Sequence, residues 1–341
     1  MKKLLFAASL LLSASVVVAQ DTESKAAQET AKGFVRQGDY PNAILILNRA
    51  LQKDASNFDL QKDLAYAYYL QRDYAHAFGV AKPLAEREDA DVQSFQILGL
   101  VYKALEERKD CEKMYRTGLK KYPSSGVLYS EYGEMLWSKK DFKEAVKQWE
   151  KGIEMDPNHS GNYYNAAKYY YFTQDKVWSI VYGEIFVNLE SYSKRTPEIK
   201  TILLDSYKKL FMDANINKGQ DMKNDFVRIF LETIQPQSTY IATNGVTPES
   251  LSAIRTKFIV DWFSKNATGH PYRLFEYQQQ LLKSGMFEAY NQWIFGAAAN
   301  LNAYENWTKL HAEEAGQFNN FQRNRVFKIP ASGQYYQTAA K

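Results

Sequence analysis

Small side chains recur along the first half of this chain at a constant step of 34 residues. One column consists of Ala31, Ala65, Gly99, Gly133 and Ala167. A second column consists of Ala43, Ala77, Cys111, Ala145 and Ser179. The columns lie twelve residues apart, which suits two neighbouring antiparallel helices whose backbones come close where only a small side chain fits. A period of this length predicts stacked helical hairpins.

An aromatic and apolar column keeps the same step and lies three residues after the first small column. It consists of Phe34, Tyr68, Tyr102, Leu136 and Tyr170. In the third and fourth units, Cys111-x3-Tyr115 and Ala145-x3-Trp149 are followed by Pro123 and Pro157. These motifs resemble the tetratricopeptide repeat, and the resemblance implies an all-α solenoid whose first helices line a concave, ligand-binding groove.

Five consecutive units fit the step without an insertion. They span residues 24–57, 58–91, 92–125, 126–159 and 160–191. The fifth unit has Phe186 where other units have Ala50, Gly118 or Gly152. A bulky ring at that position predicts that the second helix of this unit changes its packing partner.

The step ends after Ser191, but helical patterns continue from 192 to 327, and we expect a divergent, all-helical C-terminal domain that continues or caps the array. Helices are predicted to start at Thr196 and Thr247, each threonine acting as the cap before a proline. In the second of these helices, the apolar face is formed by Leu251, Ile254, Phe258 and Trp262. Arg255, Lys257 and Lys265 are predicted to lie off that face.

Further helices are predicted over 223–233, 272–283, 286–299 and 303–315. A loop is predicted over 235–244, and the segment 328–341 is predicted to be a loose tail.

The first twenty residues predict a secretory signal peptide. Lys2 and Lys3 precede an apolar run from residue 4 to 18, and Ala19 supplies a small residue before a plausible cleavage point. The run is shorter than the roughly twenty residues of a membrane span. No later segment predicts a membrane span. We therefore expect an exported protein of the periplasm of a Gram-negative bacterium. Its signal sequence resembles those of the Bacteroidetes group.

Charge and cysteine usage narrow the functional classes. The net charge is +4, and removal of Lys2 and Lys3 leaves 4 − 2 = +2, which argues against a nucleic-acid partner. Cys111 is the only cysteine, so no intramolecular disulfide can form. Its place in a small-residue column favours a buried, inert thiol.

Motifs for catalysis or cofactor binding are absent from the sequence. None of the four histidines lies at a metal-ligand spacing from another histidine or from the cysteine. A glycine-rich phosphate loop and a glycine-flanked nucleophilic serine are also missing. We therefore expect neither enzymatic activity nor a cofactor.

Candidate binding residues are those at helical spacing beside the first small column, because these should line the groove. They are Lys32, Arg36, Lys62, Tyr66, Tyr69, Lys103, Trp137, Tyr164, Lys168 and Tyr171. Lysine and arginine can meet carboxylates, and the aromatic rings offer flat contact area for a peptide. The alternative is that the lysines form a solvated face and the rings pack between hairpins.

Three functional hypotheses follow. The first is a non-enzymatic scaffold that binds a protein or peptide partner in the cell envelope. The second is a carbohydrate or peptidoglycan-fragment binder, suggested by Trp137, Tyr164 and Tyr171 and by Trp262, Trp293 and Trp307. The third is an enzyme with an unrecognised site in the C-terminal domain. The oligomeric state and the partner's identity are left open.

Overall fold

Two compact units make up the chain, one ending at Pro123 and the other beginning at Ser124. The structure is a computed structural model, and it describes residues 22–331. The predicted signal peptide and the last ten residues of the predicted tail lie outside that range. The described residues form helices and connecting turns, with no strand among them.

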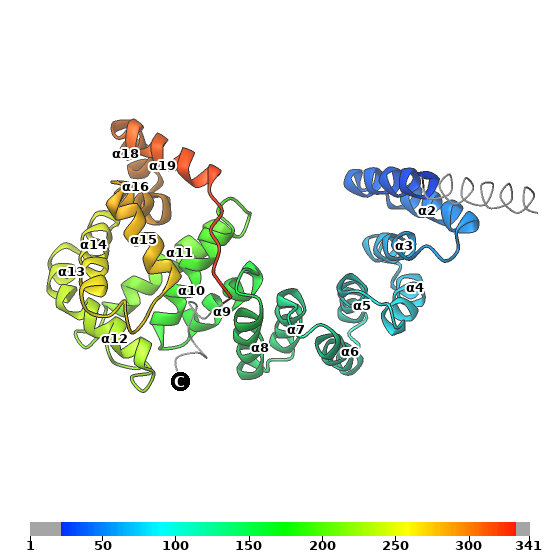
Figure 1. Cartoon of the computed structure of the whole chain (residues 1–341), viewed down its shortest axis with the longest axis horizontal. Helices are drawn as coiled ribbons and strands as arrows, with labels where there is room; N and C mark the ends of the chain where they lie inside the picture. The colour runs from blue at the N-terminus through cyan, green and yellow to red at the C-terminus, as the bar shows by residue number, and fades with distance from the viewer. Residues whose placement is uncertain (1–21, 332–341) are drawn as a thin grey trace, which may run out of the picture. The chain divides into compact units, whose positions relative to one another are not determined.

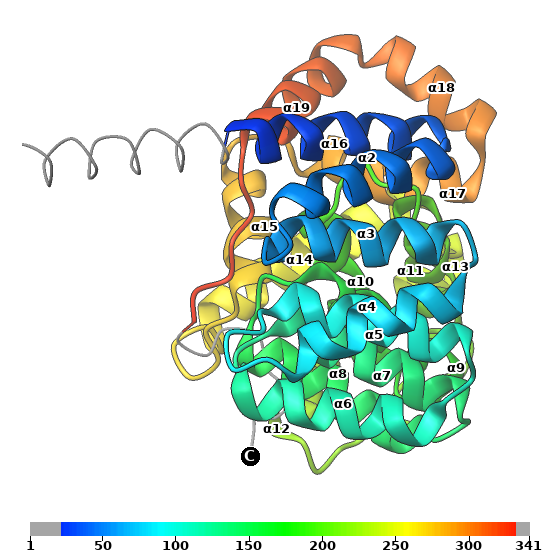
Figure 2. The same ribbon diagram turned by 90° about the vertical axis from the view of Figure 1, so that its right-hand side faces the viewer.

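Unit 1 consists of three helical hairpins. Their successive helices lie side by side (Figures 1 and 2). Its helices are 22–37, α2 (Tyr40–Lys53), α3 (Phe58–Leu70), α4 (Tyr74–Glu86), α5 (Val92–Ala104) and α6 (Arg108–Lys121). Each of the first three predicted repeats therefore contains two helices.

Unit 2 begins with two more hairpins and continues with helices that do not keep the step. The hairpin helices are α7 (Gly126–Ser138), α8 (Phe142–Met155), α9 (Ser160–Phe172) and α10 (Lys176–Leu189). The later helices are α11 (Thr196–Leu210), α12 (Asp225–Ile234), α13 (Ser238–Asn244), α14 (Pro248–Lys265), α15 (Arg273–Lys283), α16 (Phe287–Asn291), α17 (Ala297–Ala299), α18 (Leu301–Leu310) and α19 (Ala312–Asn324).

Both small-residue columns are buried, and in two hairpins a large aromatic side chain fills the space that a glycine leaves. A Cβ on Gly99 would lie less than 3.0 Å from Tyr115 Oη, and one on Gly133 would lie equally close to Trp149 Nε1. Real Cβ atoms do not approach other atoms so closely. These two positions therefore require glycine because of the ring that sits 16 residues later.

The turn inside each of the first four hairpins follows one scheme. The residue before the second helix's cap adopts a positive φ, at Gly38, Arg72, Glu106 and Lys140. An acidic cap follows, and Asp39, Asp73 and Asp141 each accept a hydrogen bond from a backbone N–H of the first turn. The left-handed residue reverses the chain, and the cap then starts the next helix.

Helix α10 explains why the last two hairpins share a core with the C-terminal helices. All its residues from Lys176 to Asn188 are buried, and it packs against α9, α11, α12 and α15. Phe186, whose bulk predicted a change of partner, is fully buried. The boundary between the compact units consequently falls inside the repeat array, whereas the sequence step ends at Ser191.

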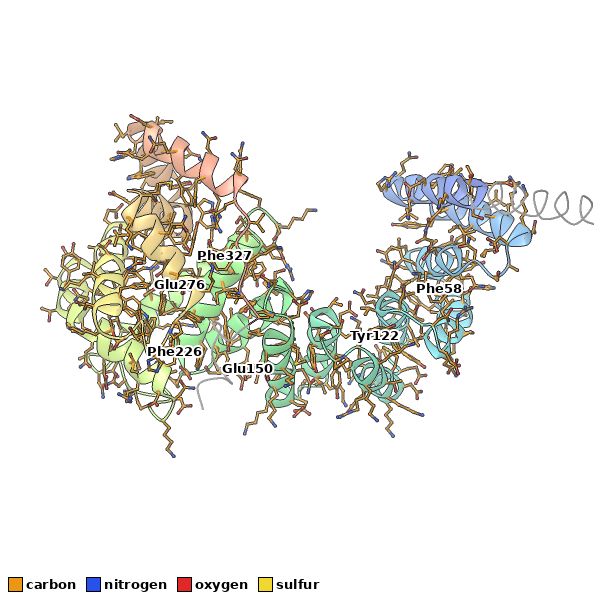
Figure 3. The ribbon with its side chains drawn as sticks, in the orientation of Figure 1. Phe58, Tyr122, Glu150, Phe226, Glu276 and Phe327 are labelled. Atoms are coloured by element: carbon orange, nitrogen blue, oxygen red, sulfur yellow. The ribbon has the colours of Figure 1, made fainter. Side chains whose placement is uncertain are left out.

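The core of the C-terminal helices contains a cluster of aromatic rings around Phe226, which Figure 3 labels. Phe226 stacks on Trp178, with 5.4 Å between ring centroids, and contacts Trp262 and Phe275 at 5.8 and 6.2 Å. The predicted apolar face of α14 is confirmed, since Leu251, Ile254, Phe258 and Trp262 are all buried.

Four details of the sequence-based prediction were wrong. Arg255 is buried rather than off the apolar face, because Glu184 pairs with it in the interior. The predicted loop over 235–244 is a 3₁₀ turn (Gln235–Gln237) followed by α13. The helix predicted over 303–315 is two helices, α18 and α19. Thr196 lies inside α11 instead of capping it, because its hydroxyl donates to the Glu190 carbonyl.

The beginning of the predicted loose tail is held against unit 2. Ile329 is buried, and its backbone N–H and carbonyl both hydrogen-bond to the Asn158 side chain at 2.9 Å. Residues 332–341 of that tail lie outside the described range. None of the helices formed by the described residues combines the length and apolar character needed to cross a membrane.

Candidate functional site

The candidate residues lie on the first helices of the hairpins, and we call the surface that these helices share the A-face. In unit 2 it is formed by α7 and α9, with α11 packed beside α9. In unit 1 it is formed by helix 22–37, α3 and α5.

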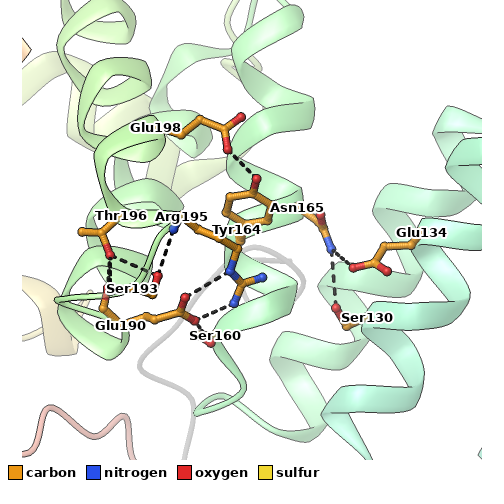
Figure 4. Close-up of polar contacts among 10 residues, drawn as sticks. All are labelled: Ser130, Glu134, Ser160, Tyr164, Asn165, Glu190, Ser193, Arg195, Thr196 and Glu198. Carbon is orange, nitrogen blue, oxygen red and sulfur yellow. Dashed lines mark hydrogen bonds and ion pairs between the residues drawn. The ribbon is translucent and has the colours of Figure 1, made fainter. Parts of the chain in front are cut away.

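Charged and polar groups on the unit 2 A-face pair with one another (Figure 4). Lys168 Nζ lies 2.8 Å from a carboxylate oxygen of Glu198 and donates to Tyr164 Oη at 3.0 Å. Tyr164 in turn donates to Glu198. The pKa of Lys168 is raised because hydrogen bonds to Glu198 and Tyr164 outweigh the opposing effect of burial. The predicted cation at Lys168 is therefore already neutralised.

A second ion pair lies at the loop between α10 and α11. Arg195 donates to both carboxylate oxygens of Glu190, and Ser160 donates to the same carboxylate at 2.7 Å. The Arg195 guanidinium also lies over the Tyr164 ring, 4.7 Å from its centroid. These contacts hold the pKa of Glu190 below its usual value despite burial. This end of the unit 2 A-face is thus a closed network.

The remaining predicted aromatics of unit 2 have partners as well. Trp137 packs against Phe142, Trp149 and Tyr169, with ring centroids 4.6 to 6.5 Å apart. Tyr171 reaches Asp205 at 3.5 Å, and Lys209 Nζ lies 3.6 Å from the centroid of its ring. For Trp137, Tyr164 and Tyr171 the structure favours the packing alternative over a free binding surface.

Sequence reasoning missed the part that α11 plays in this face. Tyr164 pairs with Glu198 and Tyr171 with Asp205, and each pair is 34 residues apart. The contact register of the repeats therefore continues for one more helix after the small-residue columns end. Counting 34 residues onward from each predicted aromatic would have found both carboxylates.

Lys62 must be removed from the predicted set. It is buried, and its ammonium bridges Asp59 at 2.9 Å and Asp91 at 2.6 Å. It also lies over the Phe58 ring, 4.8 Å from the centroid. Hydrogen bonds to the two aspartates raise its pKa although burial acts in the opposite direction. Lys62 thus joins α3 to the start of α5 and offers no charge to a ligand.

Other candidates of unit 1 are accessible. Tyr66 is 38% exposed, and its ring stacks on that of Tyr69 at 6.2 Å. Arg36 is exposed and Lys103 is half-buried, and neither makes an ion pair within residues 22–331. Lys32 contacts Glu29 at 3.4 Å across an exposed surface, where such a pair contributes little. The unit 1 A-face therefore combines stacked tyrosines with available cations.

The side chain of Asp63 brings a carboxylate to the unit 1 A-face. Gln28 donates to Asp63 at 2.8 Å, which ties helix 22–37 to α3. Burial raises the pKa of Asp63, while the bond from Gln28 and the charge of Lys32 oppose that rise. This carboxylate is thus half-buried and occupied by an amide.

The tryptophans that suggested glycan binding do not form a platform. Trp262 is 0% exposed and lies in the ring cluster around Phe226, and Trp293 is 7% exposed. Trp307 stacks on His311 with 4.7 Å between centroids. Two of the three C-terminal tryptophans are therefore core residues.

The structure adds no catalytic constellation among residues 22–331. Within that range no three His, Cys, Asp or Glu side chains are placed to hold a metal ion. Cys111 is buried, as its column predicted. The buried ion pair of Glu184 and Arg255 borders a cavity of only about 10 Å³, which has no room for a substrate.

Comparison with known proteins identifies the class of fold. Residues 29–89, in the first two hairpins, match the family model described as Tetratricopeptide repeat. The predicted fold class is confirmed: the described chain is all-helical, with consecutive packed hairpins of this type. The fold is that of protein-binding scaffolds and is typically non-enzymatic. A search of curated proteins gave no match.

Several solved structures resemble the chain. YrrB, described as a TPR protein with an unusual peptide-binding site, is 16% identical and covers 55% of this chain and 96% of its own, with a TM-score of 0.38. MamA from AMB-1 is 18% identical over 55% of this chain and 90% of its own, at 0.35. A thermophilic TPR protein from Thermus thermophilus is 15% identical over 60% of this chain and 95% of its own, at 0.30.

Proposed function

We propose that this chain is an exported, non-enzymatic scaffold of the periplasm, which binds an extended acidic segment of an envelope protein along the unit 1 A-face. The binding residues are Lys32, Arg36, Tyr66, Tyr69 and Lys103. Tyrosine rings supply flat contact area at low cost in conformational entropy, and the cations match carboxylates of the bound segment.

The observation that carries the proposal is the presence of stacked, accessible tyrosines beside Arg36 and Lys103, which have no carboxylate partner within residues 22–331, and beside Lys32, whose contact with Glu29 is exposed. Tyr69 and Lys103 occupy equivalent positions 34 residues apart on α3 and α5, which pack together. Gln28 and Asp63, 35 residues apart, show that side chains of neighbouring first helices touch on this face. An extended segment crossing α3 and α5 would therefore meet an aromatic ring and then a cation.

The test is recovery of a partner from an envelope extract with the exported chain as bait, followed by two variants. Lys103→Glu and Tyr66→Ala should each reduce recovery at least tenfold, since they reverse a charge or remove a ring at the contact. Matched controls are Lys120→Glu, an exposed cation on α6, and Tyr240→Ala, a tyrosine of unit 2 that is 45% exposed. The controls should recover the partner as the unchanged chain does.

Equal recovery by all four variants would exclude the unit 1 A-face as the binding surface. Recovery that falls only with Tyr240→Ala would move the site to unit 2. The proposed location has its own test, because cell fractionation should find the chain in the periplasm with residues 1–20 removed. Full-length chain in the cytoplasm would contradict it.

A further inference from the structure

A cavity of about 410 Å³ lies in unit 2, and none of its lining residues belongs to the unit 1 A-face. One wall is the loop from α10 to α11 and the first turns of α11, with Tyr192, Thr196 and Lys200. The other wall is formed by Trp293 and by Ala297 and Ala298 of α17. Its volume is within the range of small-molecule sites in proteins.

Lys200 is the charged group of this cavity, and no carboxylate balances it within residues 22–331. Its ammonium donates to the backbone carbonyl of Trp293 at 2.6 Å and lies 3.7 Å from the centroid of that ring. Burial lowers the pKa of Lys200 to about 7, and no neighbouring charge contributes to the shift. A bound anion would restore the missing counter-charge.

The backbone beside Lys200 is irregular. Residues Gln292–Gly296 form a π-helical turn between α16 and α17. Such turns are rare and occur frequently at functional sites. Here the turn contains Trp293, whose carbonyl accepts the bond from Lys200. The irregular segment thus helps to position the only lysine of the cavity wall.

The remaining residues that line the cavity indicate the chemical character of the uncharged part of the ligand. Tyr192 is 60% exposed and offers a ring face at the rim, while Pro197, Ala297 and Ala298 are apolar and small. No acidic side chain lines the cavity. A carboxylate could meet the ammonium while an apolar or aromatic body lies against these walls.

We propose that this cavity binds a small carboxylic acid with an apolar or aromatic body, the carboxylate pairing with Lys200. The site is independent of the peptide-binding proposal, since it uses none of the same residues. It gives the C-terminal region a ligand of its own beside its structural role.

The experiment is calorimetric titration of the whole chain with phenylacetate and with phenylacetamide, which has the same shape but no charge. Phenylacetate should bind at least tenfold more tightly, because a charge-assisted hydrogen bond is about twice as strong as a neutral one. Inorganic phosphate, which lacks the apolar body, should bind more weakly than phenylacetate. Equal binding of both organic probes, or no binding of phenylacetate at 10 mM (about the weakest affinity such titration detects), would overturn the proposal.

Variants locate the site. Lys200→Met should weaken phenylacetate binding at least tenfold, whereas Lys194→Met, an exposed lysine of the same loop, should leave it unchanged. Ala297→Trp fills the cavity and keeps the lysine, so it should cause a similar loss even if Lys200→Met fails to fold. Unchanged binding by a folded Lys200→Met variant, or by Ala297→Trp, would contradict the assignment.

Discussion

The side chains of the two A-faces follow the same 34-residue register, but they differ in whether they already have hydrogen-bond or ion-pair partners. In unit 2, Lys168 and Tyr164 are joined to Glu198, and Tyr171 is covered by Lys209. In unit 1, Tyr66 and Lys103 occupy the same kind of position and have no such partners among the described residues. Position in a repeat therefore indicates where a side chain lies, while its partners decide whether it can bind a ligand.

The units also differ in how their interiors are built. Unit 2 contains the buried ion pair of Glu184 and Arg255. Gln278 and Tyr290 donate hydrogen bonds to the Glu184 carboxylate at 2.6 and 2.8 Å. All six tryptophans of the chain lie in unit 2. Tryptophan fluorescence consequently reports the unfolding of unit 2 and can measure its stability in each variant.

The largest expected effect is on the buried ion pair. Arg255→Met should destabilise unit 2 by about 3–5 kcal/mol, because removal of one partner leaves Glu184 charged and unpaired in the interior. Urea unfolding followed by tryptophan fluorescence measures the change. Lys257→Met, on the same helix but exposed, is the control and should change the free energy of unfolding by less than about 0.5 kcal/mol. Equal effects of the two substitutions would mean that the pair is not buried.

The second-largest loss of stability is expected from overpacking in the first small-residue column. Gly133→Leu should destabilise unit 2 by about 1–3 kcal/mol, since even a Cβ would collide with Trp149. Gly316 of α19 has open space at its Cβ position, so Gly316→Leu is the matched control. An unchanged urea midpoint for Gly133→Leu would show that α7 and α8 do not approach each other as described.

A pH dependence specific to unit 2 follows from Glu150, labelled in Figure 3. Burial raises its pKa from 4.5 to about 8, with Tyr170 donating to the carboxylate. The folded state therefore favours the protonated acid. Its contribution to stability is complete below pH 4.5 and is lost as pH rises through about 8.

Glu150→Gln isolates this contribution, because the amide does not titrate. The difference in unfolding free energy between the parent chain and the variant should shift towards the variant between pH 4.5 and about 8. Asp175, whose pKa burial raises to about 7, remains in both proteins, and its charge contributes to the raised pKa of Glu150 that the variant removes. A difference that stays constant over this range would contradict the burial of Glu150.

The smallest expected effect concerns the ion pair on the unit 2 A-face. Lys168→Ala should cost no more than about 1 kcal/mol, because Lys168 and Glu198 are 33% and 45% exposed and solvent screens the pair. Partner recovery from the envelope extract should stay the same. A tenfold loss of recovery would show that this paired cation also contacts the ligand, and the contrast between the A-faces would then fail.

The sequence contained the repeat register but not the pairing of its side chains. The alanines and glycines at a step of 34 predicted the hairpins because close helix contacts admit only small residues. Lys62 looked like a groove residue because its spacing is correct, yet Asp59 of the same helix and Asp91 at the N-cap of α5 neutralise it. Arg255 looked like a surface residue because its partner, Glu184, is 71 positions away.

The continuation of the A-face into α11 shows the same limit. The small columns end after the fifth hairpin, so the visible period stops there, but Glu198 and Asp205 still meet Tyr164 and Tyr171. Helix α10 is buried on all sides and binds the later helices through contacts that have no fixed spacing. Periodicity predicts contacts that repeat at a fixed step, but it does not predict contacts that occur only once.

Photocrosslinking at two equivalent positions distinguishes a ligand-binding A-face in unit 1 from a self-paired A-face in unit 2. Tyr69 of unit 1 and Tyr171 of unit 2 are each replaced by the photoreactive residue p-benzoylphenylalanine, and intact cells are irradiated. We expect a covalent adduct with an envelope protein from position 69 and little or none from position 171. Adducts from position 171 alone, or from neither position, would contradict it.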